Sequence, residues 1–173
     1  RVASLALISG ALVLPRQNSR LGTLLFLIPG LGEKLYNGLR KDPDKAFWTL
    51  SEYYASLEQM PQAFRQWLWL RVNQRVWDDA QRRAYFSTLR NLALRIAAGA
   101  NSRLQRLKRQ TQPTLIIWGA ADQVVPAENA AFLAQNIPNA RQVLIAGAGH
   151  NVQQEKPAEV CEAILQDERL SVG

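Results

Sequence analysis

Residues 113–126 read PTLIIWGAADQVVP, and residues 143–150 read VLIAGAGH. Each stretch is a short apolar run that leads into glycine and then presents one ionisable side chain, Asp122 in the first and His150 in the second. A continuous run of Leu, Ile and Val is typical of a strand that is buried on both faces of a parallel sheet. Because the chemistry of such sheets lies beyond the carboxyl ends of their strands, the pattern predicts that Asp122 and His150 lie at one sheet edge.

The sequence around these two stretches alternates between strand and helix patterns. A helical pattern follows each apolar run, and an earlier apolar run at residues 2–8 indicates a further strand. Strands that alternate with helices of about ten residues are typical of βαβ units and a parallel sheet. From residue 113 onward we expect strand, helix, strand and helix at residues 115–118, 127–136, 141–145 and 157–166.

The middle of the chain contains helical patterns and no second convincing strand. Asp42 before Pro43 is a typical N-cap followed by proline at the first helical position. Asp78 with Gln81 resembles a capping box. Aromatic and aliphatic residues recur between these signals at helical spacing. We expect helices at residues 43–57, 61–76, 79–98 and 103–109.

Together these patterns predict an α/β architecture in which a long helical segment interrupts a parallel sheet. A chain of 173 residues that is 47% hydrophobic is long enough to bury a sizeable core. We expect a core strand in residues 1–14, a helical insertion in residues 15–112, and the C-terminal part of the α/β core in residues 113–173.

Charge is divided unevenly along the chain, whose net charge is +7. Lys and Arg outnumber Asp and Glu by 18 to 7 up to residue 112, and the ratio is 3 to 7 after it. A basic region can bind nucleic acid or anionic membranes, but no zinc finger, RNA-binding motif or glycine-rich phosphate loop accompanies it. We interpret the basic residues as solvated helix faces and expect no nucleic-acid partner. Nucleic-acid binding by residues 90–109 would have to weaken steeply with salt.

The numbers of cysteine and histidine residues and the length of the apolar segments indicate which kinds of site and which location to expect. The single cysteine, Cys161, cannot form an internal disulfide, and one histidine cannot build a Cys/His metal cluster. We expect no metal or organic cofactor, and a reducing, cytoplasmic location. The most apolar window, residues 21–31, is shorter than the roughly 20 residues that a bilayer span needs, so we expect no transmembrane segment. Within it, residues 24–32 form either the lip of an apolar pocket or a buried connector.

Asp122 and His150 are the candidate catalytic residues. A carboxylate beside an imidazole fixes its tautomer and stabilises its protonated form, and histidine suits the role of a general base near neutral pH. Taken singly, Asp122 can equally form a turn or cap the next helix, and His150 can be a solvated loop residue. The conjunction of acid and histidine after neighbouring parallel strands favours the catalytic interpretation.

These stretches, together with AGAGHNVQQEKPAEV at residues 146–160, resemble the C-terminal end of α/β-hydrolase-fold proteins. In that family the triad acid follows the seventh strand, the histidine follows the eighth, and a helical cap is inserted after the sixth. The resemblance implies that residues 2–10 hold the sixth strand, that Asp122 is the acid and that His150 is the base. No Asp or Glu lies between Ser9 and Gly32, so the sixth strand offers no alternative acid.

The family's nucleophile motif does not occur in this sequence. That motif is a Gly-x-Ser-x-Gly elbow after the fifth strand, which works with an oxyanion donor from an earlier loop. Ser9 lacks the glycine that stands two residues before the serine in this motif. We also place Ser9 at the opposite end of a strand from the one where the motif occurs. The resemblance therefore implies a C-terminal portion of a longer protein, with the missing N-terminal half as its partner. Without that half, we expect the chain to be inactive and its first strand to be an exposed edge.

The expected function is hydrolysis of a small apolar ester or a similar acyl compound. Two alternatives stay open. Epoxide hydrolases and haloalkane dehalogenases, which this family resembles, use an Asp nucleophile, and Tyr53, Tyr54 or Tyr85 would then polarise an epoxide. A third possibility is a hydrolase-like domain that binds a ligand or partner without catalysis.

Other residues receive structural interpretations. Glu128 and Glu155 lie near expected helix starts, where carboxylates are favourable to the helix dipole. Cys161 is expected to be a small buried hydrophobe on the last helix. Three aromatic residues lie off the main apolar stripes and are candidates to face a substrate or another surface: Trp48, Tyr53 and Trp69.

Overall fold

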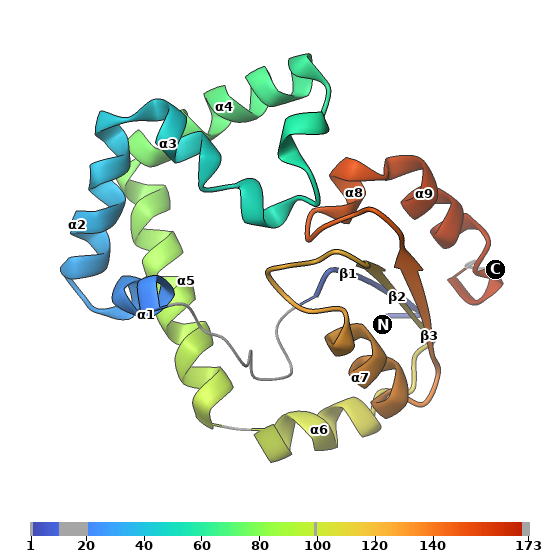
Figure 1. Ribbon diagram of the computed structural model, residues 1–173. Helices are drawn as coiled ribbons and strands as arrows, with labels where there is room; N and C mark the ends of the chain where they lie inside the picture. Colours follow the sequence, from blue (N-terminus) through green and yellow to red (C-terminus); the bar gives the residue numbers. More distant parts are fainter. Residues whose placement is uncertain (1, 11–20, 99, 171–173) are drawn as a thin grey trace. The chain divides into compact units, whose positions relative to one another are not determined.

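The computed structural model describes residues 2–10, 21–98 and 100–170 (Figure 1). These residues form two compact units. The first, here called the sheet unit, comprises residues 2–10, 52–56 and 100–170. The second, the helical unit, comprises residues 21–51 and 57–98.

The sheet unit contains three parallel strands, which confirms the predicted parallel sheet. The strand order is β1-β2-β3, so β2 is central. Leu5 of β1 pairs with Thr114 of β2, and Thr114 pairs with Ala140 of β3, so the three strands begin in register. The strands span Leu5–Ile8 (β1), Thr114–Gly119 (β2) and Ala140–Ile145 (β3).

Strand β2 is buried on both faces, as its unbroken apolar run predicts. All six of its residues are buried. Leu115 and Ile117 belong to a core cluster that includes residues of α9 (Pro157–Leu165), whereas Ile116 and Trp118 belong to a second cluster with residues of α7 (Glu128–Asn136). Side chains alternate across a strand. Helices therefore cover both faces of the sheet, and the strand ends stay open for loops (Figure 1).

A packing contact and a hydrogen bond further stabilise the sheet unit. Leu107 of α6 (Ala100–Lys108) packs against the cluster on the α7 side. The indole nitrogen of Trp118 donates a hydrogen bond of 3.0 Å to the carbonyl oxygen of Val125. This bond satisfies the only polar atom of a fully buried side chain, and it ties the loop after β2 to the core.

The helical unit is built around Phe86, whose side chain is almost fully buried. The ring centroids of Phe26, Tyr36 and Tyr85 lie 6.2, 5.8 and 5.2 Å from that of Phe86. Such offset and edge-on aromatic pairs add to the stabilisation that burial provides. The helices of this unit span Leu21–Leu27 (α1), Leu31–Gly38 (α2), Pro43–Trp48 (α3), Gln62–Trp77 (α4) and Asp79–Ala98 (α5).

Both predicted helix caps are present. The side chain of Asp42 accepts the backbone N–H of Lys45 at 2.9 Å. The side chain of Asp78 accepts the backbone N–H groups of Ala80 and Gln81 at 2.8 and 3.0 Å. The hydrogen bond from the backbone of Gln81 is the main reason that the pKa of Asp78 is lowered. These carboxylates satisfy amide groups that a helix N-terminus otherwise leaves without partners.

The helix expected at residues 43–57 is wrong in its extent. Helix α3 ends at Trp48, where the Thr49 hydroxyl donates to the carbonyl oxygen of Ala46 at 2.7 Å. Two short 3₁₀ turns follow, at Ser51–Tyr53 and Leu57–Gln59. The apolar spacing that suggested one helix continues through these turns, so periodicity alone did not show the break.

Residues 24–32, which we expected to form a pocket lip or a buried connector, lie in the end of α1, the turn after it and the start of α2. Helix α1 has no acidic residue in its first turn and no basic residue in its last. Helix α2 begins after Gly30, whose φ of 81° lies in the left-handed region that favours glycine. The backbone N–H of Gly30 donates to the Glu33 carboxylate at 2.8 Å. Sequence signals for these two starts are therefore weaker than a Ser, Thr, Asp or Asn cap.

The interpretation of Cys161 as a buried hydrophobe is wrong, because the residue is exposed. Helix α9 buries Val160 and Ala163, while Leu165 is 82% exposed. The helix presents the side of Val160 to the sheet, which leaves the adjacent position 161 facing outward. Among the described residues, no helix combines the length and the apolar composition required to cross a membrane.

The central strand provides a test of the core. We expect Ile117→Ala to lower the free energy of unfolding by about 2–5 kcal/mol, because it removes a fully buried side chain and leaves a cavity. The matched control is Leu144→Ala on β3, whose side chain is 48% exposed and should cost less than about 1 kcal/mol. Urea denaturation followed by circular dichroism measures both. Equal losses in the two variants would contradict the assignment of β2 as the core strand.

Candidate active site

Asp122 lies in the loop that follows β2, and three groups hold its carboxylate. One oxygen, Oδ1, accepts the backbone N–H groups of Val124 and Val125, both at 2.8 Å. The other, Oδ2, lies 2.9 Å from Nδ1 of His150. The Asp122 side chain is fully buried, whereas that of His150 is 20% exposed. The two backbone donors orient the carboxylate and leave one oxygen free for the imidazole.

His150 follows β3 after the four residues Ala146-Gly147-Ala148-Gly149. Gly147 has a φ of 66°, a left-handed conformation that glycine adopts without strain. Ala148 is fully buried in the core cluster on the α9 side of the sheet. The chain therefore turns sharply at the end of β3 and anchors itself at Ala148. This turn brings the imidazole ring to Asp122, as the sequence predicts.

Backbone hydrogen bonds join the two loops directly. The N–H of Ala120 donates to the carbonyl oxygen of Ile145, and the N–H of Ala121 donates to that of Ala148, both at 2.9 Å. At Gly119, an added Cβ would lie 2.1 Å from the carbonyl oxygen of Gly149. Only glycine permits this approach. The separation between Asp122 and His150 is thus fixed by backbone contacts as well as by their own side chains.

Glu155 lies near a helix start, as expected, because it precedes Lys156, the N-cap of α9. It is also the last residue of the short helix α8 (Val152–Glu155), and it makes contacts that the sequence did not predict. Its carboxylate accepts the backbone N–H groups of Gly149 and Ala55, each at 2.7 Å. Gly149 precedes His150, while Ala55 lies 100 positions from Glu155 in the sequence. No local sequence signal marks such a bridge.

The segment of residues 52–56 packs beside His150 within the sheet unit. The ring centroids of Tyr53 and His150 are 5.8 Å apart, with the planes tilted by 59°. The carbonyl oxygen of Tyr53 accepts the backbone N–H of Asn151 at 2.9 Å. Tyr54 is 2% exposed, and its hydroxyl donates to the side-chain oxygen of Gln154 at 2.5 Å. Burial raises the pKa of Tyr54, so this hydroxyl stays protonated and can donate.

The remaining predicted candidates lie elsewhere. Tyr85 packs against Tyr36 and Phe86 in the helical unit. Glu128 is exposed in the first turn of α7, as expected for a carboxylate near a helix N-terminus. Among the described residues, no group of three or more His, Cys, Asp or Glu side chains could hold a metal ion.

Ser9 lies at a different strand end from the one that we expected. It follows β1 directly, at the carboxyl end of that strand, and its φ is 43°. Its backbone N–H donates to the carbonyl oxygen of Ile117 at 3.0 Å, while its hydroxyl oxygen is buried without a hydrogen-bond partner. Ser9 therefore lies at the carboxyl edge of the sheet, and its hydroxyl makes no hydrogen bond to His150.

The geometry defines what the pair can do chemically. An ionised carboxylate only accepts hydrogen bonds, so a contact at 2.9 Å assigns the proton of a neutral imidazole to Nδ1. Nε2 of His150 then carries the free lone pair and can accept a proton. If it does, Asp122 stabilises the positive charge that forms on the ring. This geometry is compatible with proton acceptance at Nε2 of His150.

Comparisons with known proteins agree with this fold. The sequence model of the family described as alpha/beta hydrolase fold matches residues 1–157. A monoacylglycerol lipase from Homo sapiens is 36% identical over 61 residues, which cover 35% of this chain and 18% of that protein. A putative carbamate hydrolase from Stutzerimonas stutzeri is 39% identical over 74 residues, which cover 42% of this chain and 28% of that protein.

Solved structures extend the similarity to nearly the whole chain. A 2-hydroxy-6-oxo-6-phenylhexa-2,4-dienoate hydrolase from Rhodococcus superposes with a TM-score of 0.68 at 17% identity, covering 96% of this chain and 55% of that one. An esterase from Exiguobacterium antarcticum gives 0.60 at 20% identity, with coverages of 98% and 57%. At these identities the likeness concerns the fold. The chain spans little more than half the length of these two proteins.

The close approach at Gly119 yields a prediction. We expect Gly119→Ala to lower the free energy of unfolding by about 1–3 kcal/mol and to shift the His150 ring resonances, since the new methyl group pushes against the backbone of Gly149. The matched control is Gly38→Ala, where an added Cβ meets nothing within 4 Å, and stability should be unchanged or higher. Denaturant titration and NMR measure both effects. Unperturbed His150 resonances in the Gly119 variant would contradict the packing described here.

Proposed function

Because this chain belongs to the α/β-hydrolase fold family, we propose that Asp122 and His150 are the acid and base of a catalytic triad. The reaction would be hydrolysis of a small apolar ester or a similar acyl compound. The observation that carries the proposal is the contact of 2.9 Å between Asp122 Oδ2 and His150 Nδ1. The two backbone amides that bind the other carboxylate oxygen hold Asp122 in the orientation that this contact needs.

The proposed chemistry follows from the oriented imidazole. Nε2 of His150 takes the proton of a serine nucleophile as the serine oxygen bonds to the acyl carbon. Asp122 stabilises the imidazolium, which then gives its proton to the leaving alcohol. In the second half of the reaction, Nε2 takes a proton from water, the hydroxide attacks the acyl carbon, and the serine regains its proton. The net result is one ester and one water converted to an acid and an alcohol.

We propose that the nucleophile and the oxyanion donors come from a segment outside this sequence. No Gly-x-Ser-x-Gly motif occurs among the 173 residues. Among the described residues, β1 pairs with β2 alone, so its outer edge is open to a further strand. A segment that pairs with this edge would place the residues after its own strand at the same carboxyl edge as Asp122 and His150.

Three observations support this domain arrangement and substrate class. In sequence, residues 15–112 separate β1 from the rest of the sheet, which is the place of the family's cap insertion. The Tyr53 ring beside His150 provides a flat apolar surface for the acyl group. A monoacylglycerol lipase and an esterase are among the similar proteins. Without the outside segment, the chain would lack a nucleophile and should not hydrolyse esters.

A fluorophosphonate probe tests the proposal on the intact protein. We expect labelling of a serine outside residues 1–173, and loss of that labelling in His150→Ala, because the nucleophile then lacks its base. Ser9→Ala is the matched control and should label like the parent protein. Labelling confined to Ser9 would contradict the proposal. So would the absence of labelling in a protein that binds ester analogues, an outcome that favours an Asp nucleophile or a binding domain.

The orienting acid yields a separate prediction. We expect Asp122→Asn to lower kcat for ester hydrolysis by about 10⁴-fold, because an amide at this position no longer favours the Nδ1–H tautomer. Asp79→Asn in the helical unit is the matched control and should leave kcat within about twofold, since Asp79 is an exposed partner of Arg40 and Arg82. Circular dichroism verifies the fold of both variants. Near-normal activity of Asp122→Asn would exclude Asp122 as the triad acid.

A further inference from the structure

The loop that carries His150 packs directly against a distant segment of the chain within the sheet unit. Its Asn151 donates a backbone N–H to the carbonyl oxygen of Tyr53 at 2.9 Å. Its Gly149 lies so close to the segment that an added Cβ would be 2.6 Å from the backbone nitrogen of Ala55. This close approach requires glycine, since any side chain at position 149 would displace the segment.

Glu155 binds both partners of this contact through its two carboxylate oxygens. Oε2 accepts the backbone N–H of Gly149, the residue before His150, and Oε1 accepts the backbone N–H of Ala55, each at 2.7 Å. Hydrogen bonds to a carboxylate are shorter and stronger than those between neutral groups. A glutamine amide has one acceptor oxygen and one donor nitrogen, so it could satisfy only one of the two N–H groups. The bridge therefore depends on a carboxylate at this position.

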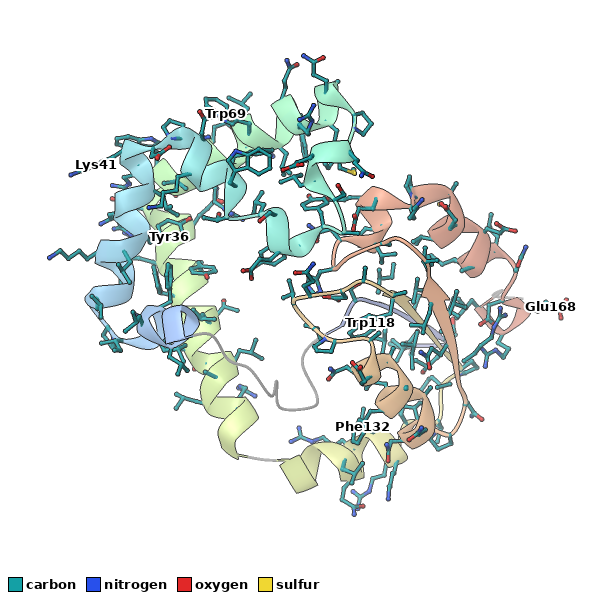
Figure 2. The ribbon with its side chains drawn as sticks, viewed as in Figure 1. Tyr36, Lys41, Trp69, Trp118, Phe132 and Glu168 are labelled. Carbon is teal, nitrogen blue, oxygen red and sulfur yellow. The ribbon has the colours of Figure 1, made fainter. Side chains whose placement is uncertain are left out.

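The loop that carries Asp122 has an anchor of its own. Trp118, labelled in Figure 2, is fully buried, and its indole nitrogen donates to the carbonyl oxygen of Val125 at 3.0 Å. The Glu155 bridge acts on the other member of the pair, because it binds the residue next to His150. Loss of the bridge should therefore move the imidazole and leave the carboxylate in place.

The bridge also fixes the ring of Tyr53, which is partly exposed beside His150. The two ring centroids lie 5.8 Å apart, and the ring planes are tilted by 59°. The backbone that carries this ring is bound by Asn151 at the Tyr53 carbonyl and by Glu155 at the Ala55 amide. An aromatic ring this close to a general base offers apolar surface to the acyl chain of a bound ester.

We propose that Glu155 is a positioning residue that holds the Tyr53 ring beside His150, where the ring contacts the acyl chain of the substrate. Glu155 acts through these two residues. This role rests on the proposed function of the Asp122–His150 pair, and it makes Tyr53 the determinant of acyl-chain preference. Contact with the ring favours long apolar acyl chains over acetyl, because the free energy gained grows with the apolar area that is buried.

NMR of the intact protein tests the positioning directly and requires no turnover. We expect Glu155→Gln to weaken the nuclear Overhauser effects between the rings of Tyr53 and His150, and to speed hydrogen exchange at the two bridged amides. The matched control is Glu159→Gln, which removes an exposed carboxylate of α9 that pairs with Lys156. It should change neither signal. Circular dichroism verifies the fold of both variants. Unchanged Overhauser effects in Glu155→Gln would overturn the proposal.

Steady-state kinetics of the intact protein tests the effect on substrate preference. Tyr53 is partly exposed, so Tyr53→Ala should fold. We expect this variant to lower the ratio of kcat/KM for p-nitrophenyl octanoate over p-nitrophenyl acetate by at least about fivefold. Glu155→Gln should lower the same ratio, and the double variant should add little to either single change, because both act on one contact.

A merely structural role of Glu155 would lower kcat/KM equally for the two esters, and that result would overturn the proposal. Additive effects in the double variant would also overturn it. If the intact protein hydrolyses no ester, the proposed function fails, and the NMR comparison alone decides whether Glu155 holds the two rings together.

Discussion

The Asp122 carboxylate is the interaction on which the candidate site depends. It is fully buried, and a buried charge is tolerated only when hydrogen bonds compensate for the lost water. Two backbone amides and one imidazole provide those bonds. The same three contacts fix the loop after β2, the loop after β3 and the tautomer of His150. Stability and proposed chemistry are therefore coupled through one side chain.

The sheet edge could be predicted because its causes are local. An apolar run that leads into glycine, as at Gly119, identifies a buried parallel strand, and parallel strands in one sheet present their carboxyl ends together. The caps at Asp42 and Asp78 could likewise be predicted from the sequence, because a carboxylate before a helix accepts hydrogen bonds from amides only two or three residues away. The prediction was strongest where the physical cause lay within a few residues of its effect.

Other features of the structure depend on tertiary contacts that no local sequence pattern predicts. Glu155 accepts amides from Gly149 and from Ala55, which is 100 positions away, and no short motif encodes that bridge. Cys161 shares an apolar stretch with Val160 but faces outward, because the rotation of a short helix is set by the sheet it covers.

The central claim is that Asp122 holds His150 as an oriented base, and NMR of the imidazole tests it most directly. The chain contains one histidine, so the ring signals need no assignment by mutation. At a pH where the ring is neutral, the ¹⁵N spectrum of imidazole-labelled protein should show Nδ1 protonated and Nε2 unprotonated, with a Nδ1–H proton protected from exchange. A predominant Nε2–H tautomer with a rapidly exchanging ring would contradict the account.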